Sequence, residues 1–350
     1  MLELRSPDAA FERIEEYLQD RGFFRSGGEE LVADVYLGYG LSEPLRRGTH
    51  AAPPEPCPRL PLAAVAVRDT SGGRTPGLVR IGRWERTWPE AEYSGAVEAV
   101  RAAIGRGDVY QVNLVQHLSA PCEGEAPALA AALAPFRPLA PLLEGEGWAI
   151  VSASPELFLA RSGRRVWTAP IKGTRPLGEH VEGAKDAAEH TMIVDLERND
   201  LSRVCEPGSV RWPELMAERE LAGVTHLVST VEGRLRAGVG LAELLAATFP
   251  GGSVTGAPKL AALDQIARLE PVGRGASMGA LGVVRGNGDL ELALTIRTFA
   301  VADGRIHLWV GGGIVWDSDP REEIEESWVK ARPLLAAVGS RAAATVEAPA

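Results

Sequence analysis

The chain of 350 residues has few cysteines and no long apolar run. Its three cysteines, Cys57, Cys122 and Cys205, lie far apart, and no Cys-x-x-Cys occurs. This usage argues against a disulfide framework or a thiolate metal site, and it fits a reducing, cytoplasmic location. The most apolar stretch, 126–143, is interrupted by prolines and by Arg137. It is therefore not expected to span a membrane.

Positively charged residues are also fewer than negatively charged ones. The sequence has 37 Lys and Arg against 47 Asp and Glu, a formal net charge of -10. Nucleic acid and anionic membranes are therefore not expected as main partners. The first twenty residues are charged and lack an apolar segment, so no signal peptide is predicted. The apolar and charged fractions, 45% and 24%, are ordinary for a globular protein.

Lysine is the scarcest charged residue, because only Lys172, Lys185, Lys259 and Lys330 accompany 33 arginines. Lys172 lies in "TAPIKGTRP", after a proline and between an isoleucine and a glycine. Arginine cannot be deprotonated in a protein, so it cannot replace a nucleophilic amine. A lysine kept in an arginine-rich chain is therefore a candidate for chemistry.

Periodicity predicts a mixture of helices and antiparallel hairpins. Helices are expected over about 9–20, from about 90, over 184–204 and from 320 to about 338, with a strand near 109–118. Hairpins are expected to turn at Ser162-Gly163 and at Asp303-Gly304. This alternation favours an α+β or layered α/β body with antiparallel sheet over a simple βαβ succession.

The last helix has the clearest start signal. Asp319 is expected as the N-cap, Pro320 as the first helical residue, and Glu322 follows three residues after the cap. Its apolar stripe is Ile324, Trp328, Ala331 and Leu335. The segment beyond it, 339–350, is predicted to be a disordered tail, and residues 1–85 a short N-terminal portion packed on the core.

The first hairpin brings a carboxyl and an amine together. A turn at 162–163 places Glu156 opposite Ala169, three residues before Lys172. Both side chains would emerge at the open end of the hairpin, as nucleophile and proton carrier. The apolar Pro170-Ile171 setting favours the neutral amine by desolvation. The alternative is a surface lysine paired loosely with Glu156.

Four carboxylates occur in two helical pairs. Asp186 and Glu189 share one face of a helix, and Glu323 and Glu326 share a face of the last helix. Hard oxygen ligands from two elements suit magnesium, which takes one or two carboxylates and keeps positions for water and substrate. The alternative is two solvated helix faces.

Two glycine-rich stretches and one arginine complete the candidates. "FPGGSVTGAPK" (249–259) is not a Walker A loop, because no Gly-Lys-Ser/Thr follows, and "GGGIV" begins at residue 311. Both stretches could present backbone amides to a small anion, or both could be tight turns. Arg297, expected on a strand among apolar neighbours, needs a partner, either a substrate carboxylate or a structural acid.

Taken together, these stretches resemble the chorismate-utilising family, which includes anthranilate synthase component I, aminodeoxychorismate synthase component I, and isochorismate and salicylate synthases. Eight motifs occur in family order over about 90–335: "VYQVNLVQ", "SASPELFL", "APIKGTRPLG", "AEHTMIVDLERNDLSRV", "VTHLVSTVEG", "FPGGSVTGAPK", "LTIRTF" and "GGGIVWDSDPREEIEESWVKA". The resemblance implies a catalytic domain over 86–338, built as a layered sandwich of antiparallel sheets flanked by helices.

Two positions bear on the subtype within the family. Isochorismate and salicylate synthases carry a lysine base where this chain has Gln111, as the nitrogen-adding members do. Anthranilate synthases typically have alanine at the position of Lys172, whereas aminodeoxychorismate synthases have lysine. The chain therefore looks most similar to aminodeoxychorismate synthase component I.

The resemblance also implies roles for the site residues. Lys172 would attack carbon 2 of chorismate while Glu156 protonates the departing 4-hydroxyl, and ammonia would then displace the lysine. Magnesium would bind through Glu189 and Glu326, with Asp186 and Glu323 close by. Substrate-binding residues would be Gln111, Thr174, His226, Ser253, Arg297, Gly311, Gly312, Gly313 and Lys330.

The ammonia source is expected on a partner. No cysteine lies in a Gly-x-Cys-x-Gly elbow, so a separate glutaminase subunit is predicted. Two rival functions are an anthranilate synthase with an unusual lysine and a non-catalytic scaffold that binds a glutaminase.

Overall fold

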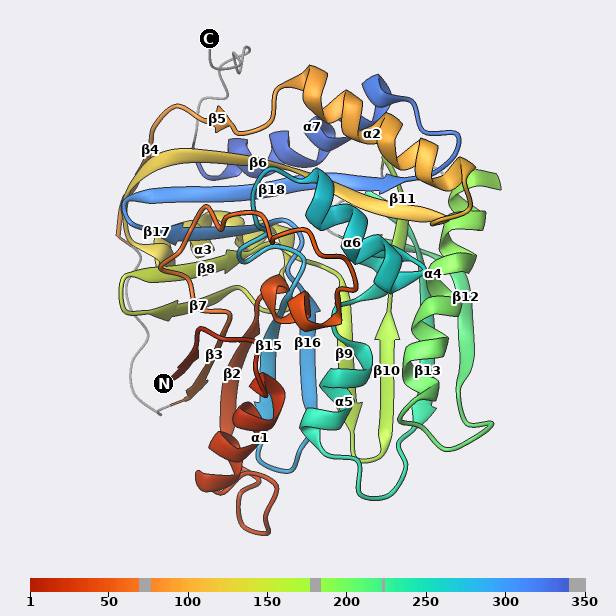
Figure 1. Cartoon of the computed structure of the whole chain (residues 1–350). Coiled ribbons are helices and arrows are strands. Elements are labelled where there is room, and N and C mark those ends of the chain that lie inside the picture. The colour runs from red at the N-terminus through yellow and green to blue at the C-terminus, as the bar shows by residue number, and fades with distance from the viewer. Residues whose placement is uncertain (69–76, 177–183, 222–223, 340–350) are drawn as a thin grey trace.

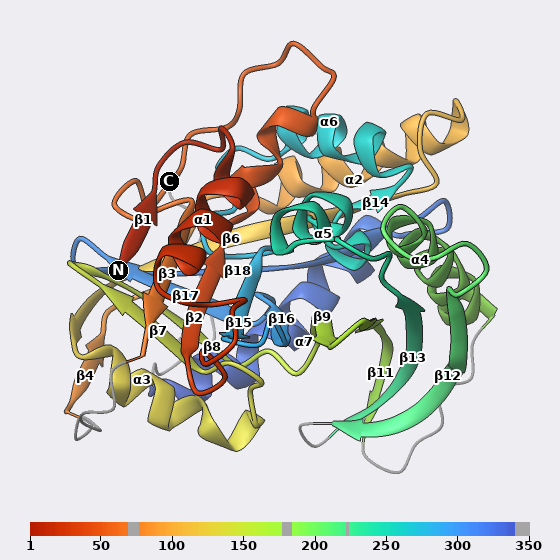
Figure 2. The same ribbon diagram turned by 90° about the horizontal axis from the view of Figure 1, so that it is seen from below.

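Two antiparallel sheets form the centre of the protein, and helices cover them (Figure 1). A computed structural model describes residues 1–68, 77–176, 184–221 and 224–339. The strands of one sheet run crosswise to those of the other, as Figures 1 and 2 show. The predicted layered α+β arrangement with antiparallel sheets is confirmed.

The first sheet has ten strands in the order β1-β3-β2-β15-β16-β9-β10-β13-β11, with β12 also paired to β13. Their bounds are β1 (Leu2–Leu4), β2 (Val32–Leu37), β3 (Ala63–Val67), β9 (Leu157–Ser162), β10 (Arg165–Ala169), β11 (Ile171–Pro176), β12 (Arg211–Leu221), β13 (Val224–Arg234), β15 (Ala280–Arg285) and β16 (Leu290–Leu294). Because β2 pairs with β15, with Leu37 opposite Ala280, N-terminal strands belong to the same sheet as strands of the C-terminal third.

The second sheet has the order β14-β6-β18-β17-β8-β7, with β4 and β5 paired to β6. Its strands are β4 (Val79–Ile81), β5 (Glu85–Arg86), β6 (Gln111–Gly124), β7 (Leu142–Gly145), β8 (Trp148–Ser152), β14 (Gly256–Ala257), β17 (Thr298–Ala302) and β18 (Arg305–Ile314). The long β6–β18 ladder, from Arg305 opposite Pro121 to Ile314 opposite Val112, is its centre.

The helices are α1 (Ala10–Asp20), α2 (Glu90–Gly105), α3 (Ala126–Leu133), α4 (Ala184–Ser202), α5 (Leu241–Thr248), α6 (Lys259–Leu269) and α7 (Pro320–Ala337), with 3-10 turns η1 (Tyr39–Leu45), η2 (Ala134–Phe136) and η3 (Gly252–Val254). Helices α1, α5 and α4 lie next to one another, in that spatial order, in front of the first sheet (Figures 1 and 2). Helices α2 and α7 pack on β6 and β18, and α3 packs on β7 and β8.

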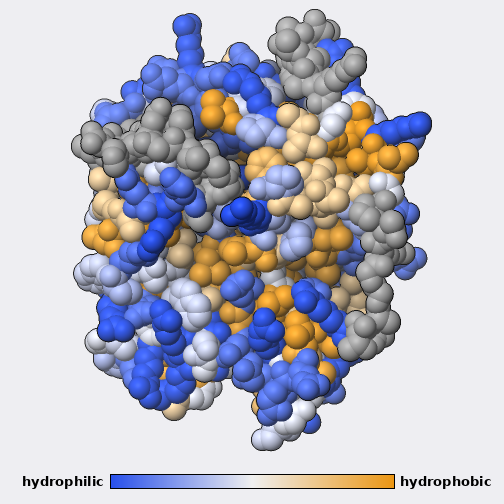
Figure 3. All heavy atoms as spheres, turned by 180° about the vertical axis from the view of Figure 1, so that it is seen from behind, coloured by the Kyte–Doolittle hydropathy of each residue, from blue (hydrophilic) through white to orange (hydrophobic). Residues whose placement is uncertain are grey.

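Buried apolar side chains form two clusters. The larger one joins α1, α2, α5 and α6 to both sheets, and the smaller one lies among β6, β8, β17, β18, α3 and α7. Apolar patches also lie between hydrophilic residues on the rear face (Figure 3), which is normal for a folded chain. The largest exposed apolar side chains include Leu78, Tyr110, Trp212, Trp316 and Val329.

The local predictions agree with several elements. Asp319 caps α7, because its Oδ1 accepts the amides of Arg321 (2.9 Å) and Glu322 (3.2 Å). The second hairpin turns where expected, with Ala302 opposite Arg305. None of the helices in the described ranges is long and apolar enough to cross a membrane. The tail predicted as disordered lies outside the described residues from 340 onward.

The predicted turn of the first hairpin is one residue too early. Ser162 is still paired, opposite Arg165, so the two loop residues are Gly163 and Arg164. Gly163 has a φ of 57°, which favours glycine, and its amide donates to Asp289 Oδ1 at 2.7 Å. The bulge between Trp167 and Ala169 then places Ala169 opposite Leu157 instead of Glu156.

Candidate active site

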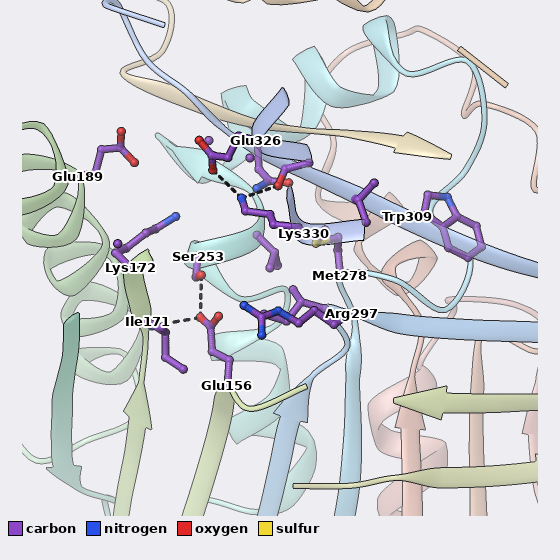
Figure 4. Close-up of a pocket in the computed structure, with 18 of the residues that line it drawn as sticks. Glu156, Ile171, Lys172, Glu189, Ser253, Met278, Arg297, Trp309, Glu326 and Lys330 are labelled. Atoms are coloured by element: carbon purple, nitrogen blue, oxygen red, sulfur yellow. Dashed lines mark hydrogen bonds and ion pairs between the residues drawn. The ribbon is translucent and has the colours of Figure 1, made fainter. Parts of the chain in front are cut away.

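A cavity of about 640 Å³ lies where strands of both sheets approach α4 and α7 (Figure 4). Its walls come from β6, β11, β13 and β18, from the segments around Glu156, Ser253 and Arg297, and from the two helices. Most of the residues singled out in the sequence line it: Glu156, Lys172, Glu189, His226, Ser253, Arg297, Gly311, Gly312, Gly313, Glu323, Glu326 and Lys330. Segments more than 150 residues apart in the chain therefore converge on one space.

Glu156 is a buried acid at the floor of the cavity. It directly precedes β9, and its carbonyl accepts the amide of Leu294, which fixes its backbone against β16. Its carboxylate Oε1 accepts the hydroxyl of Ser253 at 2.8 Å and the amide of Ile171 at 3.4 Å. Burial raises the pKa of Glu156, and the Ser253 hydrogen bond and the charge of Lys172 only partly oppose this. Burial therefore favours a protonated carboxyl that can donate a proton.

Lys172 reaches into the cavity from the next strand. It lies on β11, opposite Leu227 of β13, and the register shifts directly after it, where Gly173 has a φ of 63°. Figure 4 shows its side chain pointing into the space between Glu189 and Glu156. Its charge acts on the pKa of Glu156, so the amine and the acid are within electrostatic reach.

His226 lies on β13 behind Lys172. Its Nδ1 donates to the Gly173 carbonyl at 2.7 Å, which leaves Nε2 as the acceptor nitrogen of a neutral ring. Burial lowers the pKa of His226, and nearby Arg297 and Lys330 lower it further. The ring therefore stays neutral and fixes the backbone turn that follows the lysine.

Arg297 does not lie on a strand, contrary to the prediction. It is in the connection between β16 and β17, where it adopts a φ of 50°, and its carbonyl accepts the Ala153 amide at 3.0 Å. Such a backbone conformation is costly for a residue other than glycine and recurs at binding sites. Burial lowers the pKa of Arg297, and the Glu156 charge opposes that shift. Figure 4 shows the guanidinium beside the acid, within the cavity.

The three glycines of β18 form a wall made of backbone. Gly311, Gly312 and Gly313 pair with β6 on one side, whereas β17 pairs only as far as Leu308 on the other. Over the described residues, no strand covers that second edge beside the cavity. A side chain on Gly311 would overlap the Leu114 carbonyl, and one on Gly313 would overlap the Gln111 amide. The close packing of the two strands therefore requires glycine here.

The acidic residues of α7 meet at the middle glycine. A Cβ on Gly312 would lie 3.3 Å from Glu323 Oε2 and 3.3 Å from Glu326 Oε1. Glu323 is held by the Ser318 hydroxyl at 2.6 Å, and Glu326 accepts the Lys330 ammonium at 2.7 Å. Figure 4 shows Glu189 of α4 on the same side of the cavity.

This donor set fits a hard cation such as Mg²⁺. The carboxylates of Glu323 and Glu326 border a space that is open because Gly312 has no side chain, and the carboxylate of Glu189 faces the same cavity. Magnesium needs one or two carboxylates and completes its shell with water and substrate. Among the described residues, no three acidic, histidine or cysteine side chains already converge as a preformed cage. Lys330 Nζ, which donates to Glu326 and to the Gly311 carbonyl (2.8 Å), supplies a positive charge beside these carboxylates.

Three predicted site residues are not placed in the cavity. Gln111 is 2% exposed and lies behind Gly313, so it does not line the cavity wall. The side chains of Thr174 and Asp186 lie outside the described residues. Sequence reasoning also missed Asn113, which lines the cavity from β6 two residues after Gln111. The alternation of side chains along a strand could have indicated it.

A second group of charged residues that was not predicted lies behind the Ser253 loop. Lys259 bonds Asp200 and the carbonyls of Pro250 (2.6 Å) and Thr248 (3.3 Å), and Glu197 accepts the amide of Gly252 at 2.9 Å. These residues belong to "DLERND" and "APK", two of the motifs that carry the family resemblance.

Known proteins are similar to the chain in sequence and in fold. A family model described as "chorismate binding enzyme" matches residues 49–336. Anthranilate synthase component 1 of Streptomyces coelicolor is 41% identical over 271 residues, 73% of this chain and 53% of that protein. Aminodeoxychorismate synthase component 1 of Klebsiella aerogenes is 41% identical over 268 residues, 72% of this chain and 59% of that protein.

A solved structure is also similar to the chain in fold. Anthranilate synthase component I of Streptococcus pneumoniae superposes with a TM-score of 0.77 at 27% identity, covering 86% of this chain and 80% of that one. The chain spans between 53% and 62% of the length of the first curated relatives it matches. On the family match, the sequence identities and the shared fold, the chain belongs to the chorismate-binding enzyme family.

Proposed function

We propose that the chain converts chorismate and ammonia to 4-amino-4-deoxychorismate, for 4-aminobenzoate and folate synthesis. The observation that carries this proposal is Lys172, whose amine shares one cavity with the buried acid Glu156 and with three carboxylates. Relatives named aminodeoxychorismate synthase component 1 are 38–41% identical to this chain, which supports the same reaction. The reaction would take place in the cytoplasm.

The chemistry begins with displacement of the 4-hydroxyl. The Lys172 amine forms a bond to carbon 2, the two conjugated ring double bonds each shift by one position, and the bond from carbon 4 to oxygen breaks. Glu156 transfers its proton to the departing oxygen, which leaves as water. Ammonia then bonds to carbon 4, both double bonds shift back, the lysine is expelled, and the new ammonium group returns a proton to Glu156. Chorismate and ammonia thus yield the amino product and water, with the pyruvyl ether retained.

The cavity walls orient the substrate. Arg297, Lys330 and the backbone edge at Gly311, Gly312 and Gly313, which β17 does not pair, would bind its carboxylates. Ser253 and His226 would complete the pocket beside Glu156 and Lys172. Gln111 would act from behind Gly313, and Thr174 and Asp186 keep the roles that the resemblance implies.

Glu189 and Glu326, with Glu323 beside them, would hold Mg²⁺. When bound, the ion neutralises substrate carboxylate charge and fixes the ring in place. Lys330 would then turn from Glu326 toward a substrate carboxylate. Glycine at position 312 leaves the space in which the carboxylates and the ion can meet.

Ammonia would come from a separate glutaminase subunit. The relatives carry the name "component 1", which implies a second component in those enzymes. Free ammonium should replace that partner in a purified reaction.

Product analysis tests the proposal. The protein is incubated with chorismate, Mg²⁺ and ammonium, and products are separated by mass. We expect a product that keeps the pyruvyl group and gains nitrogen in place of oxygen. Anthranilate together with free pyruvate as main products would contradict it.

The second candidate function is anthranilate synthesis. Relatives named anthranilate synthase component 1 are 41% and 43% identical, as similar as the aminodeoxychorismate enzymes. The same incubation separates the two, because only anthranilate formation releases pyruvate. A scaffold without catalysis would consume no chorismate at all.

A further inference from the structure

The Ser253 hydroxyl reaches Glu156 from a loop that is held by charged side chains. In the 250–255 loop, the Pro250 carbonyl accepts Lys259 Nζ at 2.6 Å and the Val254 carbonyl accepts Arg274 Nη1 at 2.8 Å. Between them, Ser253 Oγ donates to Glu156 Oε1 at 2.8 Å. The position of that hydroxyl therefore depends on what fixes the middle of the loop.

Glu197 fixes the middle of the loop. Its Oε1 accepts the amide of Gly252 at 2.9 Å, one residue before Ser253. The loop and α4 are so close that a Cβ on Gly252 would lie 2.6 Å from Leu196 Cδ2 and 3.0 Å from Glu197 Oε1. Glu197 is 4% exposed, so water cannot replace this contact. The loop thus lies directly against α4.

Glu197 also belongs to a buried group of charges. Asp200 faces it from its own helix, Lys259 from the start of α6, and Glu156 from the end of the connection before β9. Burial, followed by the Asp200 charge, raises the pKa of Glu197 to about 7, and Glu156 adds to the rise. Lys259 acts in the opposite direction and is itself bonded to Asp200.

We propose that Glu197 is a positioning residue for Glu156. It holds the Gly252 amide so that the Ser253 hydroxyl meets the carboxyl of Glu156. The inference rests on the proposed role of Glu156 as proton donor. Neither Glu197 nor Gly252 lines the cavity, so the effect is indirect.

Two substitutions separate position from charge. Glu197→Gln keeps an oxygen acceptor for the Gly252 amide without a charge, whereas Glu197→Leu removes both. We expect Glu197→Leu to lower kcat for chorismate consumption by about tenfold or more, with KM changed less. Glu197→Gln should restore most of kcat, because its amide oxygen can still accept the Gly252 N–H.

Glu15→Leu is the matched control. Glu15 accepts the amides of Leu241 (2.9 Å) and Ala242 (3.1 Å), so its loss removes the same kind of contact away from the cavity. It should lower thermal stability while leaving kcat and the pH profile unchanged. Equal kcat in the wild type and Glu197→Leu, or a kcat as low in Glu197→Gln as in Glu197→Leu, would overturn the proposal.

Infrared spectroscopy gives a readout that does not depend on turnover. The protonated-carboxyl band that disappears in Glu156→Gln identifies Glu156. Its C=O frequency should rise in Glu197→Leu, because the Ser253 hydroxyl no longer donates to the carboxyl, and should stay in place in Glu197→Gln and Glu15→Leu. An unchanged frequency in Glu197→Leu would refute the role of Glu197 whatever the product is. A wild type that forms anthranilate or consumes no chorismate would instead refute the proposed function.

Discussion

Arg274 and Glu270 form a fully buried ion pair joined by two hydrogen bonds, with Nε to Oε2 at 2.8 Å and Nη2 to Oε1 at 2.6 Å. The guanidinium also donates to the carbonyls of Asn113 (2.7 Å) and Val254 (2.8 Å), both of which line the cavity. The pair therefore supports the cavity from behind, and neither charge has access to water.

Removing one partner of this pair should be strongly destabilising. Arg274→Ala leaves Glu270 buried without its cation, so the free energy of unfolding should fall by about 3–5 kcal/mol. Urea denaturation measures the change. The double variant Glu270→Leu/Arg274→Met should recover most of the loss in unfolding free energy, because no charge is then left buried at this place. In the control Arg332→Ala, which breaks an exposed pair with Glu325, the urea midpoint should not move.

Replacement of Lys172 tests the covalent step. Both Lys172→Ala and Lys172→Arg should lower chorismate turnover by about a thousandfold or more, because arginine keeps the charge but not the nucleophile. Unfolding temperatures should stay close to the wild type, since the side chain points into the cavity. Intact-protein mass spectrometry after rapid acid quenching should show a substrate adduct in the wild type only. Turnover retained in Lys172→Arg would contradict a covalent lysine.

Magnesium binding should depend on both helices. Glu189→Gln and Glu326→Gln each remove a hard anionic ligand, so each should weaken Mg²⁺ binding by about tenfold or more. Calorimetric titration of the protein with Mg²⁺ alone measures this without turnover. Glu325→Gln is the control, because Glu325 lies next to Glu326 in sequence but pairs with Arg332 on the surface. Equal Mg²⁺ affinity in all three variants would remove the metal assignment.

A pair of stacked histidines predicts loss of stability in acid. His117 Nε2 lies 3.0 Å from His307 Nδ1, and His117 Nδ1 lies 2.7 Å from the Thr87 hydroxyl. Burial lowers the pKa of His117 to about 3 and that of His307 to about 4, from 6.5. Both rings are neutral when folded, so their contribution is complete above pH 6.5 and is lost as pH falls toward 4 and then 3.

Urea denaturation at pH 7 and pH 5 measures this contribution. The histidine pair should account for a fall on the order of 2–4 kcal/mol between the two. The double variant His117→Asn/His307→Asn should lose less stability over this interval than the wild type. His50→Asn, which changes an exposed histidine, should leave the wild-type slope unchanged. A double variant with the wild-type slope would contradict the buried neutral pair.

Local chemistry explains what could be predicted from sequence. Asp319 followed by Pro320 determines where α7 begins, and Asp303-Gly304 forms a two-residue turn. The turn near Gly163 was placed one residue early, because pattern alone does not tell which neighbour of a glycine still pairs. Family motifs, rather than periodicity, indicated that Lys172, Glu189 and the three glycines belong to one site.

Features set by distant contacts could not be predicted. Nothing near Leu37 indicates that it pairs with Ala280, 243 residues away in sequence by their numbering. Arg297 was expected on a strand because its neighbours are apolar, but two sheets meet there and the chain bends between them. Gln111 was expected to contact substrate, yet the backbone of Gly313 lies in front of it.

The two faces of the cavity are built from different materials. On β18, the main chain of three successive glycines forms the surface, whereas side chains from β11, from α4 and from Glu156, just before β9, form the other face. Main-chain donors and acceptors are the same whatever residues occupy other positions. A substitution at one position of the side-chain face can thus change the chemistry of the cavity while the main-chain groups that would contact a ligand stay the same. A side chain added to the glycine face would instead fill part of the cavity itself.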